Sequence, residues 1–387
     1  MTVTFYSNFL SDHQLPLCQE FLNVLGEDNF YFVAHTKIDP ERVSLGFDDM
    51  NEMYPFVVKA YEGGASYLKA KELMLYSDVV IIGSYENMPF EERVLNNKLT
   101  FRYNERLLKK GDYLWFHPRV QLGVYKNWTK FRKNNLYTLC ASAFTSRDLE
   151  LFGYPREKCF TWGYFPIVKE YDNLELLFDK KELSRFKHDC LSILWAGRFV
   201  EYKHPDHALK IAQKLKREGF KFHLNMIGTG HLCPVLISMI KEFDLEQDVS
   251  IIGPVSPVEV RTYMENSEVF IFTSDRNEGW GVVLNEALNS CCAVVANKSI
   301  GSVPFMLEDN INGLLYDNDL DQAYECVKQL FNDPVLRRSI AQQAYSSIIN
   351  IWNPKTAVAN FIALVNSMLN KTYTNNFKNE PCAPIVL

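Results

Sequence analysis

The stretch VFIFTSDRNEGWGVVLNEAL, residues 269–288, decides how this 387-residue chain folds. It begins with an apolar run without alternation, which is typical of a parallel strand buried on both faces. A polar turn, a Gly-Trp-Gly sequence at 279–281 and a helix-forming run follow. A strand, a glycine turn and a helix start place backbone N–H groups and the positive end of a helix dipole at one point. The pattern therefore predicts an anion site, most often one for phosphate.

Two glutamates frame this turn. Glu278 follows the strand at its carboxyl end, where open α/β sheets bind their ligands, and Glu286 lies on the helix. Each also has a purely structural interpretation, as a helix-dipole partner for Glu278 and as a solvated helix position for Glu286. The strand in front and the glycines between them favour a ligand site.

The sequence from Glu278 to Gly281, followed by Glu286 and Ala287, resembles the E-x7-E signature of the retaining GT-B glycosyltransferases of family 4, the group 1 glycosyl transferases. The resemblance implies that the first glutamate contacts hydroxyls of a donor sugar and the second binds the nucleotide ribose. The glycines and the following amides would hold the sugar and the diphosphate. These substrate-binding roles fall on Glu278, Gly279, Trp280, Gly281, Val282, Val283 and Glu286.

A second element of the same kind lies upstream. The run LSILWAGRF at 191–199 reads as a buried strand that ends in Gly197 and Arg198, and Lys203 follows before a helix from about residue 206. An arginine fork with a lysine point charge can neutralise a diphosphate without a metal ion. The order resembles the family's G-R-x4-K element, and the alternative is a surface Arg–Lys pair. Because the segments expected to line a cleft hold no Asp-x-Asp pair, we expect no metal and no cofactor beyond a UDP-, GDP- or ADP-linked sugar as co-substrate.

Two further turns belong to the same expected site. Gly228, Thr229 and Gly230 follow a strand at 222–227, where glycines let the backbone approach a ligand. Pro254 and Val255 end the next strand, which in relatives lies against the nucleotide base. We therefore assign these turns to substrate binding.

The N-terminal half alternates strands at 3–7, 31–34, 54–58, 79–83 and 99–103 with helical stretches, which predicts a doubly wound domain. The family's Gly-Gly turn after the first strand is replaced here by NFLSDH, residues 8–13. We expect His13 in this loop to face an interdomain cleft, either as a general base or as an acceptor contact or backbone-bonded histidine.

The strand at 99–103 resembles one that ends in a cleft-facing histidine in many family members. Here Asn104 and Glu105 take that place. The resemblance implies that Glu105 is the carboxylate nearest the anomeric carbon of the sugar. The alternative is an ion pair with Arg102 or Arg106.

The charge of the chain is uneven. The net charge is −6, yet residues 100–135 hold nine Lys and Arg against Glu105 and Asp112, which is +7 and leaves −13 for the rest. Six aromatic residues are interleaved between 109 and 135. This composition predicts peripheral contact with an anionic membrane near a lipid-linked acceptor; the alternative is a solvated basic face over core aromatics. We expect no nucleic-acid partner, because no such motif is present.

The composition of the chain limits which classes of protein it can belong to. The chain is 47% apolar and 23% charged, no run has the roughly 20 apolar residues of a membrane span, and no signal-like start is seen. Nine scattered cysteines without disulfide-like spacing indicate reduced thiols. We expect a cytoplasmic protein, working at the inner face of the membrane if the basic segment binds there.

Taken together, the sequence predicts an α/β protein of the GT-B class, with two Rossmann-like doubly wound domains facing across a cleft. An acceptor domain spans 1–168 with a crossover helix within 355–387, and a nucleotide-sugar donor domain spans 169–354. The tail 371–387 is expected to be loosely ordered. The expected activity is retaining transfer of a sugar to a glycan or lipid-linked acceptor hydroxyl, as in surface polysaccharide synthesis. The alternatives are an inverting GT-B transferase or nucleotide-sugar epimerase that uses His13, or a non-catalytic nucleotide-binding module.

Overall fold

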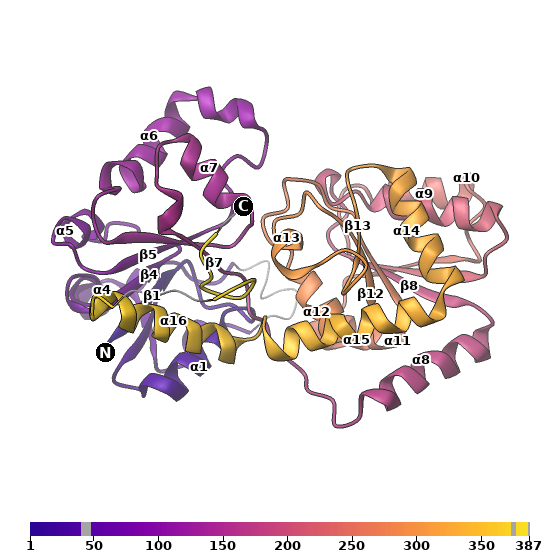
Figure 1. Ribbon diagram of the computed structural model, residues 1–387, viewed down its shortest axis with the longest axis horizontal. Coiled ribbons are helices and arrows are strands. Elements are labelled where there is room, and N and C mark those ends of the chain that lie inside the picture. The colour runs from indigo at the N-terminus through magenta and orange to yellow at the C-terminus, as the bar shows by residue number, and fades with distance from the viewer. Residues whose placement is uncertain (40–47, 373–376, 386–387) are drawn as a thin grey trace. The chain divides into compact units, whose positions relative to one another are not determined.

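The computed structural model describes residues 1–39, 48–372 and 377–385 (Figure 1). The chain forms two compact units. Unit 1 consists of Met1–Ile167 and Asn353–Leu387, and unit 2 consists of Val168–Trp352. Each unit is an α/β domain built on one parallel sheet.

The sheet of unit 1 has seven strands in the order β3-β2-β1-β4-β5-β6-β7. All of its pairs are parallel, and its central strand β4, VVII, is wholly apolar and buried, as expected for a sheet covered on both faces. The strands are β1 Val3–Ser7, β2 Phe30–Ala34, β3 Val57–Lys59, β4 Val79–Ile82, β5 Thr100–Asn104, β6 Leu136–Cys140 and β7 Cys159–Thr161. The strand expected at 54–58 begins later, because Tyr54–Phe56 forms a turn around Pro55, which has no N–H to donate.

Helices on both sides of this sheet come from the two segments of unit 1. They are α1 Leu15–Leu25, α3 Met50–Met53, α4 Gly64–Tyr76, α5 Phe90–Leu95, α6 Pro118–Asn127, α7 Thr145–Leu151 and α16 Pro354–Leu369, with short 3-10 turns η1 Ala60–Glu62, η2 Asp112–Phe116, η3 Thr129–Phe131 and η4 Arg156–Lys158. Helix α16 packs beside α1 (Figure 1). The Phe361 ring contacts Phe21, Phe101 and Trp162, with centroids 5.1 to 5.9 Å apart. The predicted crossover of the C-terminal helix to the first domain is confirmed.

The described part of the tail is ordered against unit 1, so the prediction of a loose tail is wrong for residues 377–385. Cys382 and Ala383 are buried, and Pro384 forms an antiparallel bridge with Phe160. The Cys382 N–H donates to the Thr161 carbonyl at 2.8 Å, and the Thr161 N–H donates to the Ala383 carbonyl at 2.9 Å. The tail therefore covers the edge strand β7, which would otherwise present unpaired backbone groups.

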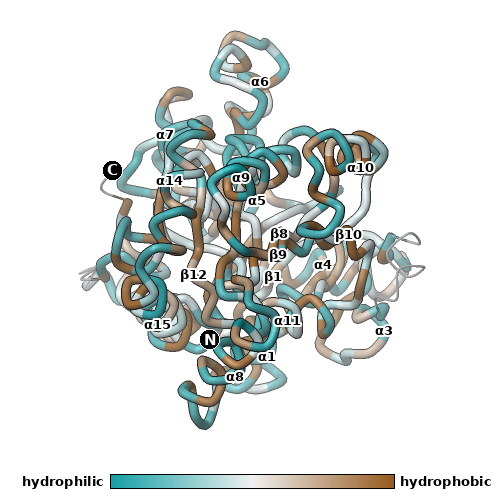
Figure 2. The backbone as a smooth tube through the Cα atoms, turned by 90° about the vertical axis from the view of Figure 1, so that its right-hand side faces the viewer, coloured by the Kyte–Doolittle hydropathy of each residue, from teal (hydrophilic) through white to brown (hydrophobic). Residues whose placement is uncertain are grey.

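Unit 2 has six parallel strands in the order β10-β9-β8-β11-β12-β13. They are β8 Leu191–Ala196, β9 Phe222–Ile227, β10 Val249–Gly253, β11 Val269–Phe272, β12 Ala293–Asn297 and β13 Leu314–Tyr316. In Figure 2 strand β12 is largely brown, in keeping with its buried residues on both faces. The chain order reverses between β8 and β11, which makes this the topological switch point of the sheet.

The helices of unit 2 alternate with these strands. They are α8 Leu174–His188, α9 Pro205–Arg217, α10 Cys233–Glu242, α11 Pro257–Asn266, α12 Val283–Asn289, α13 Val303–Met306, α14 Leu320–Asn332 and α15 Pro334–Asn350, with the 3-10 turn η5 Glu201–Lys203. The strand and helix expected around Gly-Trp-Gly are β11 and α12. The doubly wound architecture of both domains is therefore confirmed.

None of the helices in the described ranges is both long enough and apolar enough to cross a bilayer.

Candidate functional site

The predicted donor residues of unit 2 come together at one edge of its sheet. Strands β10, β9, β8 and β11 are neighbours and run parallel, so the loops that follow them meet at the carboxyl edge. These loops carry most of the predicted contacts of this unit: Gly197, Arg198 and Lys203 after β8; Gly228, Thr229 and Gly230 after β9; Pro254 and Val255 after β10; and Glu278 to Val282 after β11. The remaining two, Val283 and Glu286, lie in the first turn of α12. The two charged elements follow β8 and β11, on either side of the switch point.

An ion pair joins these two elements. The Lys203 ammonium contacts a carboxylate oxygen of Glu278, and the two side chains are only 13% and 10% exposed. The Ser274 hydroxyl donates to the same carboxylate oxygen at 3.0 Å. Lysine has three N–H donors, so Lys203 can keep this partner and still bind an anion.

The loops after β8 and β11 are also joined through Thr273. Its hydroxyl accepts a bond from the Trp195 indole N–H at 2.8 Å and lies 2.7 Å from the Lys203 carbonyl, to which it can donate. The Asp275 N–H donates to the Tyr202 carbonyl at 2.9 Å. These bonds fix the backbone on which Lys203 and Glu278 stand.

Arg198 is exposed at the same edge. Its guanidinium donates to the Tyr202 hydroxyl at 2.7 Å, which leaves further donors of the fork facing solvent. An exposed arginine and a largely buried lysine thus lie at the same edge of the sheet.

The glycines of the site are needed for backbone packing. A Cβ on Gly228, whose φ is +140°, would lie 1.9 Å from the Gly197 carbonyl oxygen, and one on Gly230 would lie 2.4 Å from the Phe199 carbonyl oxygen. Gly281 has φ +79°, and a Cβ there would lie 2.3 Å from the Phe272 ring. These contacts explain the glycines whether or not a ligand approaches them.

The Trp280 side chain supports the Gly-Trp-Gly turn from the protein interior. It is 1% exposed, its indole N–H donates to Asn285 Oδ1 at 2.9 Å, and its ring lies 5.9 Å from that of Trp352. The Ser302 hydroxyl donates to the Trp280 carbonyl at 2.6 Å. The Trp280 side chain is therefore not available for the predicted substrate contact, which only its backbone could make. Val282, Val283 and Glu286 are half-buried around the start of α12.

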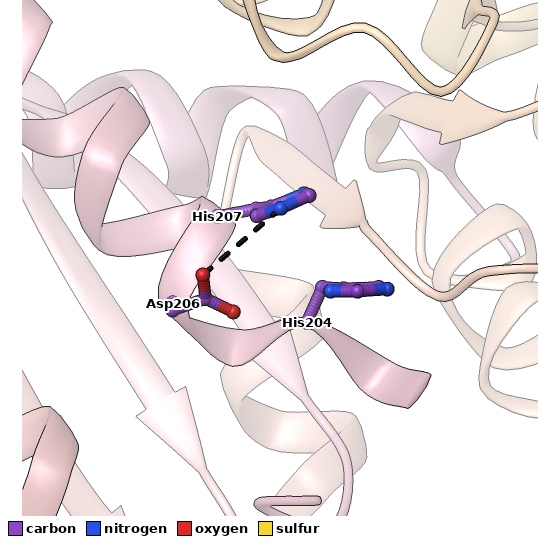
Figure 3. Close-up of side chains that lie close together, drawn as sticks. All are labelled: His204, Asp206 and His207. Carbon is purple, nitrogen blue, oxygen red and sulfur yellow. Dashed lines mark ion pairs between the residues drawn. The ribbon is translucent and has the colours of Figure 1, made fainter. Parts of the chain in front are cut away.

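Beside Lys203 lies the one group of side chains in the described ranges that could hold a metal ion: His204, Asp206 and His207 (Figure 3). Each has other partners. Lys210 donates to Asp206 at 2.7 Å, His204 Nε2 lies 3.2 Å from Asp275 Oδ2, and the two imidazoles stack with centroids 4.5 Å apart.

Stacked rings direct their nitrogen lone pairs side by side rather than at one point. The group also lies at the positive end of α9. The geometry therefore favours a brace between the two loops over an ion site.

The two catalytic candidates of unit 1, His13 and Glu105, lie at one edge of that unit's own sheet. His13 lies half-buried in the turn between β1 and α1, and Glu105 follows β5, both at the carboxyl edge of the unit 1 sheet. Glu105 forms an ion pair with Lys109 and accepts a bond from the Tyr164 hydroxyl at 3.2 Å. Lys109 is a partner that the sequence analysis did not name.

The arginines near Glu105 have internal roles. Arg102 is buried with its guanidinium 4.6 Å from the Trp128 ring centroid and 4.9 Å from that of Tyr85, and burial lowers its pKa to about 10. Arg106 pairs with Asp148 at 3.4 Å. The basic segment 100–135 is therefore not one surface, because two of its nine cations are inside the unit.

The sequence analysis missed the residues that hold the charges in place. Thr273, Ser274, Asp275 and Tyr202 carry the bonds described above. The first three directly follow β11, so the rule that ligand sites form at the carboxyl ends of parallel strands could have named them.

Solved structures support the architecture. The chain matches the crystal structure of Anabaena Alr3699/HepE in complex with UDP over 96% of its own length and 99% of that chain, with a TM-score of 0.66 and 12% identity. It matches the apo lipopolysaccharide outer core galactosyltransferase WaaB with a TM-score of 0.66 and 16% identity over 96% of this chain and 100% of that one. The fold is accordingly GT-B.

Curated relatives match part of the chain. The amylovoran biosynthesis glycosyltransferase AmsK of Erwinia amylovora is 31% identical over 36% of this chain and 35% of its own length. The putative colanic acid biosynthesis glycosyltransferase WcaL of Escherichia coli is 29% identical over 54% of this chain and 52% of its own. The matches thus span about a third to a half of these relatives.

A family model covers the candidate site itself. Residues 179–347, which include both Lys203 and Glu278, match the model described as glycosyl transferases group 1. Most of unit 2, including the candidate site, is therefore similar to the group 1 glycosyl transferases.

Proposed function

We propose that this protein is a retaining, metal-independent glycosyltransferase that moves a sugar from a nucleoside diphosphate to a hydroxyl of a glycan or lipid-linked acceptor. The observation that carries the proposal is the sheltered Lys203–Glu278 pair at the switch point of unit 2. A cation for the diphosphate and a carboxylate for sugar hydroxyls are thereby held side by side.

The donor would lie along the carboxyl edge of β8 and β11. Its diphosphate would take N–H donors of Arg198 and Lys203 and backbone amides after Gly281. Its sugar hydroxyls would donate to Glu278, and its ribose to Glu286. Each charge-assisted bond contributes about 1.5–3 kcal/mol.

In the reaction, the bond between the anomeric carbon and the diphosphate oxygen breaks, and its electron pair stays on the phosphate. The acceptor oxygen bonds the same carbon from the same face, and its proton leaves with the phosphate or to solvent. The charge that develops on the leaving diphosphate is the one that Arg198 and Lys203 would stabilise. Preorganised charges of this kind supply the largest share of such catalysis.

The acceptor would be held by unit 1, with Glu105 as the carboxylate nearest the anomeric carbon. We further propose a role in surface polysaccharide synthesis in the cytoplasm at the inner face of the membrane, to which part of segment 100–135 binds. The relatives named for amylovoran and colanic acid biosynthesis support this role.

One observation favours a second candidate. His13 follows β1 at the switch point of the unit 1 sheet, between β1 and β4, where a ligand would reach it. An inverting transferase or an epimerase would use it as a base. The configuration of the product at the anomeric carbon separates this candidate from the first.

The test is a screen of UDP-, GDP- and ADP-sugars with EDTA present, in which thermal shift and donor hydrolysis are both measured. We expect one nucleotide class to stabilise the wild-type protein and to be hydrolysed slowly, with both effects weakened in Glu286→Ala and Glu278→Gln. Glu246→Ala is the matched control, because Glu246 is exposed just before β10, at the opposite edge of the same sheet. Binding that ignores Glu278 and Glu286, or that requires a metal, would contradict the proposal.

A further inference from the structure

Helix α6 and the preceding turn η2 present apolar side chains to solvent in unit 1. Tyr113 is 65% exposed, Phe116 72%, Leu122 52% and Tyr125 52%. In Figures 1 and 2 the helix lies on the outer side of this unit, away from its sheet. Four large exposed side chains thus fall within thirteen residues of one turn and the helix that follows it, a local concentration of exposed apolar surface of the kind that marks interaction sites.

The spacing of residues along α6 places its exposed apolar side chains on one face. Leu122 and Tyr125 are three residues apart and thus share one face, while Val124 points inward and is buried. Arg119 and Lys126 are both exposed and flank Leu122 at i−3 and i+4. The outer face of α6 is therefore apolar in the middle and basic at both ends.

The patch is held rigidly although its side chains are exposed. The Trp115 indole N–H donates to the Leu151 carbonyl at 2.9 Å, and Gln121 donates to the Trp115 carbonyl at 3.0 Å. Asp112 is the single acid between residues 109 and 127, and it is paired with Arg147 at 3.1 Å. The surface is thus preformed and has a net positive charge.

We propose that this η2–α6 face, defined by Tyr113, Phe116, Arg119, Leu122, Tyr125 and Lys126, inserts into the interface of an anionic phospholipid bilayer. Aromatic and leucine side chains enter the boundary between head groups and acyl chains, and flanking cations bind the anionic head groups. The inference rests on the proposed function, in which the protein works at the inner face of the membrane, and it names the surface that would bind there. The sequence predicts membrane contact within residues 100–135, and the proposal assigns this contact to the short helix α6 and the turn η2 before it.

The test measures binding of the full chain to phosphatidylcholine vesicles with and without phosphatidylglycerol, in the absence of any sugar nucleotide. We expect binding only to the anionic vesicles and weakening by salt. Arg119→Gln with Lys126→Gln should reduce the partition coefficient about 30-fold, at roughly fivefold for each cation. Phe116→Ser with Leu122→Ser should reduce it by at least a similar factor, because apolar insertion is lost.

Leu68→Ser with Lys69→Gln on α4 is the matched control, because it removes the same kinds of exposed side chain, with Leu68 66% exposed, from another helix of unit 1. It should bind vesicles as the wild type does. Equal binding to neutral vesicles, wild-type binding by both η2–α6 variants, or tighter binding to single-stranded nucleic acid that the same variants weaken would overturn the inference.

Donor hydrolysis in solution separates this inference from the proposed reaction. A protein that hydrolyses a nucleotide-sugar but ignores anionic vesicles overturns the membrane surface alone. A protein that binds the vesicles through η2–α6 but accepts no nucleotide-sugar supports the surface and overturns the reaction alone.

Discussion

The carboxyl edge after β8 and β11 in unit 2 and the edge after β1 and β4 in unit 1 share one topology and differ in chemistry. In unit 2 the two loops carry Arg198, Lys203 and Glu278. In unit 1 the corresponding segments, 8–14 and 83–89, contain no lysine or arginine. There the contacts are neutral: Gln14 donates to the Ser7 hydroxyl at 3.1 Å and accepts from the Ser11 hydroxyl at 3.2 Å.

This comparison distinguishes two contributions to a site. The order of the strands determines where a crevice forms, and the side chains of the loops determine its charge. Winding creates a crevice at the switch point in both units. Of these loop segments, those of unit 2 carry cations and those of unit 1, residues 8–14 and 83–89, do not. The edge of unit 1 instead carries hydroxyl and amide groups together with the carboxylates Asp12 and Glu86.

The largest expected effect comes from the backbone contact beneath the unit 2 edge. Gly228→Ala should lower the free energy of unfolding of unit 2 by about 3 kcal/mol or more, because the new Cβ meets the Gly197 carbonyl at 1.9 Å and φ is +140°. Gly83→Ala, at the unit 1 edge, should cost about 1 kcal/mol or less, because its Cβ would lie 3.3 Å from the Tyr6 carbonyl.

Chemical denaturation of both variants measures this difference. Gly219→Ala is the control for φ alone, since Gly219 has φ +80° and nothing within 4 Å of a Cβ. Equal losses for Gly228→Ala and Gly219→Ala would show that the close backbone contact contributes nothing.

The second prediction compares two Lys–Glu pairs, one at each edge. Lys203→Met should reduce kcat/KM for the donor by about 100-fold or more, because it removes bonds to the diphosphate and leaves Glu278 unpaired at 10% exposure. Lys109→Met breaks the Glu105 pair, whose side chains are 36% and 29% exposed, and should change stability by less than about 1 kcal/mol. Steady-state kinetics of both variants measures kcat/KM for the donor. If Lys109→Met lowered kcat/KM as much as Lys203→Met does, Glu105 would be the critical charge instead.

A smaller effect is expected at the ribose end of the site. Glu286→Ala should raise KM for the nucleotide-sugar about tenfold with kcat nearly unchanged, because a ribose contact is made equally in the ground and transition states. Initial rates at varied donor concentration measure the two constants separately. A fall in kcat without a change in KM would place Glu286 at the reacting centre instead.

The smallest expected effect is a pH dependence that both units share. Burial lowers the pKa of His35 in unit 1 and of His223 in unit 2 from the ordinary value of 6.5. The unfolded chain therefore takes up protons first as the pH falls, and stability present above pH 6.5 is lost below it. Urea unfolding at pH 7.5 and 5.5 should show a smaller loss for His223→Asn and for His35→Asn than for the wild type. An unchanged loss in either variant would show that the histidine in question is as easily protonated folded as unfolded.

Much of this arrangement could be predicted from the sequence, because the decisive signals are local. The apolar run of β11, the glycines after it and the Arg198-x4-Lys203 spacing each lie within about ten residues, and strand–loop–helix order then places them at one edge. The bonds that hold the charges depend on tertiary contacts. Nothing local pairs Thr273 with Lys203 or Trp195, and nothing local predicts that the tail at Cys382 covers β7.

The same limit applies to the basic segment. Its composition could not distinguish Arg102, which is stacked inside the unit on Trp128, from Arg119, which faces solvent. Arg102 lies on strand β5 and Arg119 on helix α6, and the elements that pack over them decide which of the two is buried. A charge count along the chain therefore predicts that a basic surface exists, but not which of its residues form it.

Unit 2 is an insertion within unit 1, and this has a consequence for recombination. Unit 2 can be exchanged between such proteins only as a cassette with two junctions, here before Val168 and after Trp352. A cassette cut at residue 347, where the family match ends, would omit Trp352, whose ring packs against Trp280 behind the Gly-Trp-Gly turn. Stable hybrids should therefore arise from exchanges that carry this tryptophan along with the turn it supports.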